Sequence, residues 1–270
     1  MLPIGDVDVR RSTTPYITYV LICVNIVVFL YELFIAGSLI TDSILVTQFF
    51  YKWGVIPAEL THGDNIKYLS FLVMDGNTVR RDIIDISSPI HGWLTIFSSM
   101  FIHGGWLHIL GNMLFLWVFG DKIEDRFGHI RFSVFYLVAG VAAVGAQVAL
   151  NPDSQVPMIG ASGAISGVTG AYLILFPFSK IRTLLMFGLI MVVHLPAILV
   201  LGIWFLLQAF QGVGSLGEIG GGVAYWAHVG GFLIGMVCGI VYRIIRNEGL
   251  WPVQRRNPWD NFPPGYLNYR

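Results

Sequence analysis

Apolar residues gather in long runs along this chain, and short polar segments separate the runs. A helix needs about 20 mostly apolar residues to cross a bilayer. Six runs predict spans, at residues 16–36, 104–120, 131–150, 160–178, 196–211 and 222–244. A shorter apolar stretch, 184–195, precedes Pro196. It predicts either an extension of the fifth span or a segment that dips into the membrane, with a break at the proline.

Composition supports this pattern. The chain is 55% hydrophobic and 12% charged, with a mean hydropathy of +0.70. Soluble domains carry about 25% charged residues. We therefore expect an integral membrane protein. The net charge of zero gives no basic footprint for nucleic acid.

Lysine and arginine indicate the orientation, because they favour cytoplasmic loops. If the N-terminus is cytoplasmic, four of the 16 such residues lie on outer segments: Lys52, Lys67, Arg80 and Arg81. The other twelve lie on inner segments. We therefore predict an all-α polytopic membrane protein with six transmembrane helices and both termini inside.

Four segments follow from this topology. We expect a cytoplasmic N-terminal tail at 1–15, a membrane domain at 16–246 and a poorly ordered cytoplasmic tail at 247–270. Residues 37–93 form a long outer connection, and such a length usually carries structure or function of its own. Its stretch "FFYKWGVIPAEL" is amphipathic enough to lie at the membrane interface.

Polar side chains within the spans are costly and mark functional sites. His108 and Asn112 lie in the first two turns of the second span. Ser162 begins the fourth span, and His228 lies about two turns into the sixth. All three spans begin on the outer side. Their polar groups therefore lie at similar depth and indicate one site.

Glycines indicate how these spans meet. Gly163 and Gly167 belong to one stripe on the fourth span, and Gly231 and Gly235 belong to one on the sixth. Small residues at this spacing let membrane helices approach closely. Packing the two stripes together would bring the polar ends of these spans into contact.

A nucleophilic serine needs a base, since its hydroxyl is a weak nucleophile. His228 lies at the right depth to serve Ser162, and no Asp or Glu lies in the outer half of these spans. His108 and Asn112 share a helix face and can donate hydrogen bonds to a developing oxyanion. The residues therefore predict a Ser–His dyad.

Other polar residues leave alternatives open. Ser166 is a rival nucleophile, but it lies deeper, where packing or water binding is expected. His103 either contacts water or substrate or anchors the chain at the interface. Glu124 and Arg126 predict a capped turn that fixes a cytoplasmic loop. No H-E-x-x-H pattern occurs, so we expect no metal and no cofactor.

Three blocks together resemble the rhomboid family of intramembrane serine proteases. They are "HGGWLHILGNMLFLWVFGDKIEDRFG" (103–128), "GASGAISG" (160–167) and "AHVGGFLIG" (227–235). They occur in family order, and the resemblance covers roughly 90–245. It implies a six-helix rhomboid core with a cavity open to the outer side.

The resemblance also implies roles for single residues. Ser162 matches the nucleophile and His228 the base, while His108, Asn112 and the Ser162 N–H match oxyanion donors. His103 matches a histidine near the cavity. Packing glycines are matched by Gly163, Gly231 and Gly235. The implied reaction is cleavage of transmembrane segments in membrane-protein substrates. The expected partners are these substrates and the lipid bilayer, and we expect no nucleic-acid partner. The expected location is a bacterial-type inner membrane.

Two features depart from the family pattern. The first outer loop has no Trp-Arg dipeptide. Ser166 stands where some members place an aromatic residue that stacks on the histidine. We therefore expect water or a carbonyl to hold His228 here.

Two other functions compete with proteolysis. A non-proteolytic rhomboid-like protein would bind membrane clients, but it would need neither Ser162 nor His228. A channel or transporter would need polar residues deeper in the membrane, and the polar cluster stops in the outer half.

Overall fold

The computed structural model describes residues 1–9, 11–41, 43–63, 66–75, 78–90, 92–187, 189–215 and 222–249. The predicted tail 247–270 lies almost wholly outside the described residues. The helices are α1 (Tyr16–Ala36), α2 (Ile44–Trp53), α3 (Pro57–His62), α4 (Thr95–Ser99), α5 (Trp106–Phe115), α6 (Asp121–Phe127), α7 (His129–Leu150), α8 (Ser162–Leu175), α9 (Ala197–Gly214) and α10 (Tyr225–Ile245). The strands are β1 (Leu2–Asp6), β2 (Tyr68–Asp75), β3 (Thr78–Asp85), β4 (Lys180–Phe187) and β5 (Leu189–Pro196).

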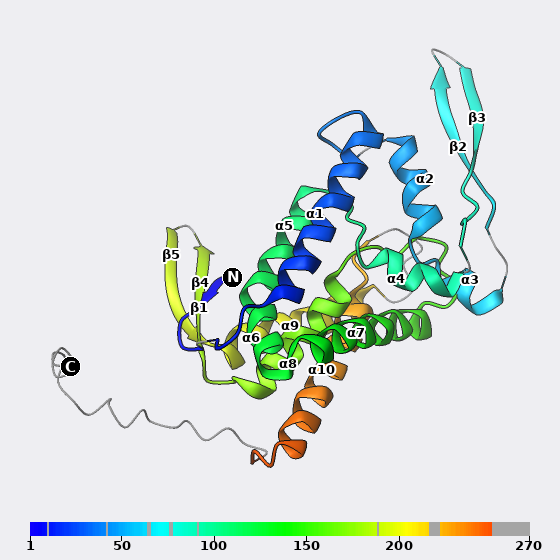
Figure 1. Cartoon of the computed structure of the whole chain (residues 1–270). Coiled ribbons are helices and arrows are strands. Elements are labelled where there is room, and N and C mark those ends of the chain that lie inside the picture. Colours follow the sequence, from blue (N-terminus) through cyan, green and yellow to red (C-terminus); the bar gives the residue numbers. More distant parts are fainter. Residues whose placement is uncertain are drawn as a thin grey trace, which may run out of the picture.

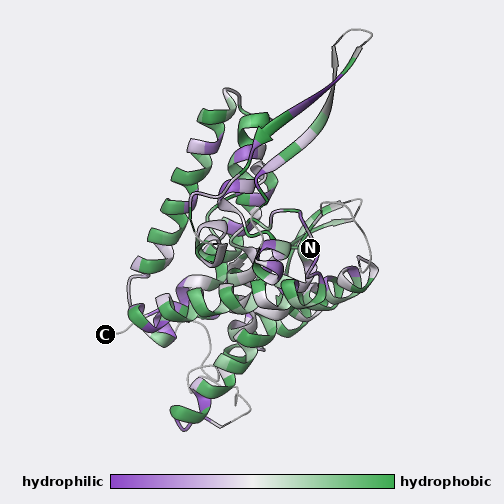
Figure 2. Cartoon of the chain, turned by 90° about the vertical axis from the view of Figure 1, so that its right-hand side faces the viewer, coloured by the Kyte–Doolittle hydropathy of each residue, from purple (hydrophilic) through white to green (hydrophobic). Residues whose placement is uncertain are grey.

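The predicted spans coincide with helices. Four of them, α1, α7, α9 and α10, are long and apolar enough to cross a membrane, and Figure 2 shows apolar residues along most of the long helices. The second predicted span is α5, which continues through a π-helical turn, Leu116–Gly120, into α6. The fourth is α8, with 14 residues. The prediction of a helical, polytopic membrane protein is therefore confirmed.

The prediction of an all-α chain is wrong. β1, β4 and β5 form an antiparallel sheet in the order β1-β4-β5. The stretch 184–195 therefore lies in a hairpin, and it does not extend α9. Burial alternates along β4, where Ile181 and Thr183 are buried and Arg182 is exposed. That is the period of a strand, which hydropathy alone does not separate from a short buried helix.

The connection 37–93 contains α2, α3 and the antiparallel hairpin β2–β3, which projects from the helices (Figure 1). Val55 pairs with Met158 in the segment before α8. Val55 and Ile56 are buried against the rest of the protein. The connection is thus anchored at the N-terminal end of α8.

The β1–β4–β5 sheet lies at the other end of α8. Asp6, the last residue of β1, accepts hydrogen bonds from Tyr172 Oη near the end of α8 and from Ser179 Oγ. Nearby, the buried Glu124 carboxylate accepts the backbone N–H groups of Ile17 and Thr18 at 2.9 and 2.8 Å. The first turn of α1 is therefore capped from α6, as the predicted structural role of Glu124 requires.

Helix α8 forms the centre of the core, with eleven of its 14 residues buried. It meets α10 through backbone contacts. A methyl group on Gly231 would overlap the carbonyl oxygen of Gly163, and one on Gly235 would overlap that of Gly167. Glycine at these positions lets the two helices approach closely enough for residues at their N-terminal ends to touch.

Candidate active site

Ser162 is the first residue of α8, and the backbone before it is shaped to expose it. Gly160 has a φ of +121°, in the left-handed region that favours glycine. A methyl group there would lie 2.7 Å from Nε2 of His108. Glycine at this position therefore allows both the turn into α8 and the close approach of the His108 ring.

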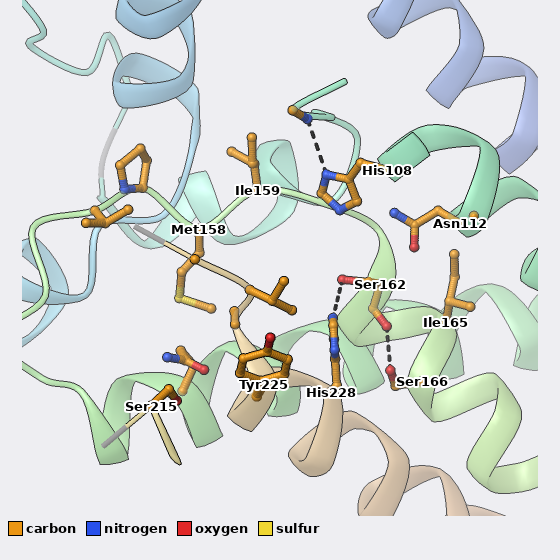
Figure 3. A pocket seen from close by; sticks show the side chains of 18 of the residues that line it. His108, Asn112, Met158, Ile159, Ser162, Ile165, Ser166, Ser215, Tyr225 and His228 are labelled. Carbon is orange, nitrogen blue, oxygen red and sulfur yellow. Dashed lines mark hydrogen bonds between the residues drawn. The ribbon is translucent and has the colours of Figure 1, made fainter. Parts of the chain in front are cut away.

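The Ser162 hydroxyl lies 2.8 Å from Nε2 of His228 (Figure 3). His228 comes from the first turn of α10, and Ser162 from the first turn of α8. The glycine contacts between these helices place the two side chains within hydrogen-bonding distance. The arrangement has the geometry of a nucleophile next to its general base.

The other ring nitrogen of His228, Nδ1, lies 2.5 Å from Oε1 of Gln208 on α9. The sequence predicts water or a carbonyl as the group that holds this ring, and the group here is the carbonyl oxygen of a side-chain amide. Trp204, one turn before Gln208, also approaches the ring, with centroids 6.0 Å apart. Sequence reasoning missed Gln208, although a polar residue within the fifth apolar run was the available signal.

Two further polar side chains of the site come from α5. Nδ1 of His108 accepts the Gly104 N–H at 3.2 Å, so the proton of the neutral ring is on Nε2, which faces Gly160. Asn112 is 7% exposed, and its Nδ2 has no partner among the described residues. Both side chains can therefore donate to a group bound near Ser162.

One cavity of about 780 Å³ is lined by Ser162, His228, His108 and Asn112. Its rim includes Asn151 and Ser154 from the connection between α7 and α8, and Val223 from the segment before α10. No charged side chain lines the cavity in the described part of the chain.

Two candidate residues differ from the rest. Ser166 borders the cavity, but its hydroxyl donates to the Ser162 carbonyl at 2.7 Å (Figure 3). His103 does not line the cavity. Its side chain is fully buried behind His108, with ring centroids 5.0 Å apart, and its backbone N–H donates to Glu32. Among the described residues, no group of three His, Cys, Asp or Glu is placed to hold a metal ion.

Relatives of the chain carry rhomboid names. RHOMBOID-like protein 4 of Arabidopsis thaliana is 32% identical over 66% of this chain and 40% of that protein. RHOMBOID-like protein 1 from the same plant is 26% identical over 90% of this chain and 57% of its own length. Rhomboid protease GluP of Bacillus subtilis (strain 168) is 32% identical over 48% of this chain and 25% of that protein. The chain thus spans between about a quarter and three fifths of these relatives.

Other matching relatives are named as mitochondrial and chloroplastic. The expected location in a bacterial-type inner membrane is therefore not supported. The apolar helices and the relatives indicate an integral membrane protein without naming its membrane. The Rhomboid domain model matches residues 91–244, more than half of the chain. The match encloses both helices of the Ser162–His228 pair and the α5 residues beside it. The chain belongs to the rhomboid family.

Proposed function

We propose that this protein is an intramembrane serine endopeptidase that cleaves transmembrane segments of membrane-protein substrates. The observation that carries the proposal is the 2.8 Å contact between Ser162 Oγ and His228 Nε2 inside a cavity. Rhomboid protease GluP, a relative, is named for proteolysis. A protein that only binds membrane clients has no need of a serine hydroxyl paired with an imidazole.

The reaction proceeds through an acyl-enzyme. His228 Nε2 takes the Ser162 proton as Oγ attacks the scissile carbonyl. His228 then gives this proton to the leaving amine, and the peptide bond breaks. A water molecule, deprotonated by the same nitrogen, hydrolyses the ester between Ser162 and the acyl group. The imidazolium returns this proton to Ser162 Oγ as the ester bond breaks, and the second product leaves with a new carboxylate.

Negative charge on the tetrahedral intermediate is stabilised by Nε2–H of His108, Nδ2–H of Asn112 and the backbone N–H of Ser162. The last is a first-turn N–H of α8, which lacks an intrahelical partner. Loss of one oxyanion donor typically lowers kcat by about 10²–10³.

The substrate class follows from the position of the site in the membrane. A peptide bond inside a helix is shielded by its neighbouring turns and has its carbonyl hydrogen-bonded. The substrate helix must therefore unwind locally, so we expect helix-destabilising residues near the cut and small residues at the cleaved position. In this proposal α5 with the following π-helical turn, Leu116–Gly120, and α8 complete six spans, with both termini inside and the cavity open to the outer side.

A fluorophosphonate probe, which modifies activated serines covalently, tests the proposal in detergent-solubilised protein. We expect the wild type and Ser166→Ala to react, and Ser162→Ala and His228→Ala not to react. Labelling that persists in Ser162→Ala would overturn the assignment of the nucleophile. If the wild type neither labels nor cleaves a transmembrane substrate, the client-binding function is favoured instead.

A further inference from the structure

A side chain outside the reacting groups holds the base. Gln208 reaches His228 from α9, at the ring nitrogen opposite to the one that meets Ser162. The distances are 2.5 Å on the Gln208 side and 2.8 Å on the Ser162 side. Gln208 is not among the residues that line the cavity. It therefore does not meet a bound substrate, and its effect on the reaction runs through His228.

We propose, building on the function above, that Gln208 is a positioning residue that fixes the tautomer and the orientation of His228. An amide oxygen is only an acceptor, so its contact with Nδ1 places the ring proton on that atom. Nε2 is then free to accept the Ser162 proton. With the opposite tautomer, Nε2 would carry a hydrogen and could not act as the base.

Among the described residues around the His228 ring, no other side chain contacts Nδ1. The ionisable side chains that line the cavity beside His228 are His108 on α5 and Tyr225 on α10. No Asp or Glu lies on the cavity wall or within α9. Ser166, on α8, uses its hydroxyl on the Ser162 carbonyl. In the described part of the chain, the Gln208 amide is thus the side chain that contacts Nδ1.

The partner comes from a different helix than the dyad itself. Ser162 and His228 lie on α8 and α10, which touch through glycines, whereas Gln208 and Trp204 lie one turn apart on α9 and share a face toward the ring. Correct orientation of the base therefore depends on where α9 packs. A displacement of α9 away from α10 would leave Nδ1 without its acceptor.

Substitutions of matched shape in the full-length protein test this role. Gln208→Met keeps the length of the side chain without a good acceptor, and Gln208→Glu keeps an acceptor oxygen. We expect Met to lower the maximal rate of fluorophosphonate labelling by about 10- to 100-fold, less than the roughly 10²–10⁴-fold that a general base contributes in full, because His228 itself is still present. The probe concentration at half-maximal rate should change little. Glu should restore most of the rate and move the acid limb of the pH–rate profile to higher pH, because a carboxylate stabilises the imidazolium.

Gln211→Met is the control, since Gln211 lies on the same helix with an exposed side chain. It should label at the wild-type rate. A wild-type labelling rate in Gln208→Met would overturn the proposal. Equal losses of rate in Gln208→Met and Gln208→Glu, with an unchanged pH–rate profile, would also overturn it, because that result is expected if Gln208 only packs against its neighbours. A wild type that does not label at all contradicts the proposed function first, so the two failures are distinguishable.

Discussion

At the scale of single residues, the two α5 side chains beside Ser162 differ in what they contact in the resting structure. His108 already accepts the Gly104 N–H through Nδ1. Asn112 has a buried Nδ2 without a partner in the part of the chain that is described. A buried donor left unpaired costs free energy, and a catalytic role is one reason for a protein to keep such a group. We therefore expect Asn112 to donate to the oxyanion.

Asn112→Ala should lower kcat for a cleavable transmembrane substrate by about 10²–10³. KM should change little, because the lost hydrogen bond forms with the transition state. The thermal unfolding midpoint should also stay near the wild-type value, since Nδ2 has no hydrogen bond to lose in the resting protein. Steady-state kinetics and a thermal melt check both parts. A large fall in the melting midpoint with unchanged kcat would assign Asn112 to the fold instead.

Much of the site could be predicted from sequence, because depth and helical period are properties of a linear pattern. Ser162, His228, His108 and Asn112 were grouped on those grounds, and they line one cavity. That pattern does not show how each helix is rotated about its own axis, and therefore which of its side chains face the cavity. His103 therefore fell among the cavity candidates although it is buried behind His108. Gln208 was missed because its partner lies 20 residues away on another helix.

At the scale of elements, the contact between α8 and α10 decides whether the dyad forms. The glycines at this contact differ from other glycines of the membrane helices in the space that they leave for a side chain. A methyl group on Gly235 would overlap the Gly167 carbonyl oxygen, whereas one on Gly145 of α7 meets nothing within 4 Å. The two positions therefore make a matched pair.

Gly235→Ala should destabilise the protein by about 1–3 kcal/mol or more, the usual cost of overpacking. It should also slow fluorophosphonate labelling, because α10 must shift and carry His228 with it. Gly145→Ala should be neutral or stabilising by up to about 1 kcal/mol through helix propensity. Thermal melts and labelling rates of the two variants check this. Equal effects at both positions would refute a specific role for the α8–α10 contact.

Helix positions were predictable because sustained apolar runs indicate membrane helices whatever their neighbours. The hairpin β4–β5 was not, since a run of twelve residues suits a buried strand as well as a helix. What settles its form is pairing with β1, about 180 residues earlier in the chain. No local pattern carries such a pairing.

Asp125 on α6 holds the N-terminal segment. It accepts bonds from the Thr13 N–H and hydroxyl at 2.7 and 2.6 Å, and from the Ser12 N–H at 3.0 Å. Burial raises the pKa of Asp125, but the hydrogen bonds from Thr13 and Ser12 outweigh it, so the pKa lies below its usual value. A lowered pKa contributes stability that is present above the unfolded-state value and is lost as pH falls through the folded-state value.

The wild type should therefore be more stable than Asp125→Asn above about pH 4, close to the unfolded-state pKa of aspartate. The difference should shrink below that pH, as the carboxylate protonates and its advantage over an amide is lost. Thermal unfolding midpoints of both proteins across this range check the prediction. A difference that grows toward acid pH would have the wrong sign.

At the scale of the whole molecule, the two ends of α8 define two sides. The insert 37–93 lies beside the cavity rim, where Thr61 Oγ1 donates to the Pro152 carbonyl at 2.8 Å and the Ala58 N–H to that of Ser154 at 3.0 Å. The β1–β4–β5 sheet and the start of α1 lie at the opposite end. Figure 1 shows the β2–β3 hairpin and this sheet well apart on the helical body. Ser154 lines the cavity on the side that carries the hairpin, so we expect water to enter the cavity from that side.

The distribution of Lys and Arg predicts that the hairpin faces the outside and the N-terminal segment the cytoplasm. With Cys23 and Cys238 replaced by alanine, single cysteines at two exposed positions test this: Ser70→Cys on β2 and Thr14→Cys before α1. In sealed, right-side-out vesicles, a membrane-impermeant maleimide should label Ser70→Cys and leave Thr14→Cys unmodified until detergent is added. Because the cavity rim lies on the hairpin side, this result would also place the entry of water on the outer face. The reverse labelling pattern would overturn the orientation and would place hydrolysis on the cytoplasmic side.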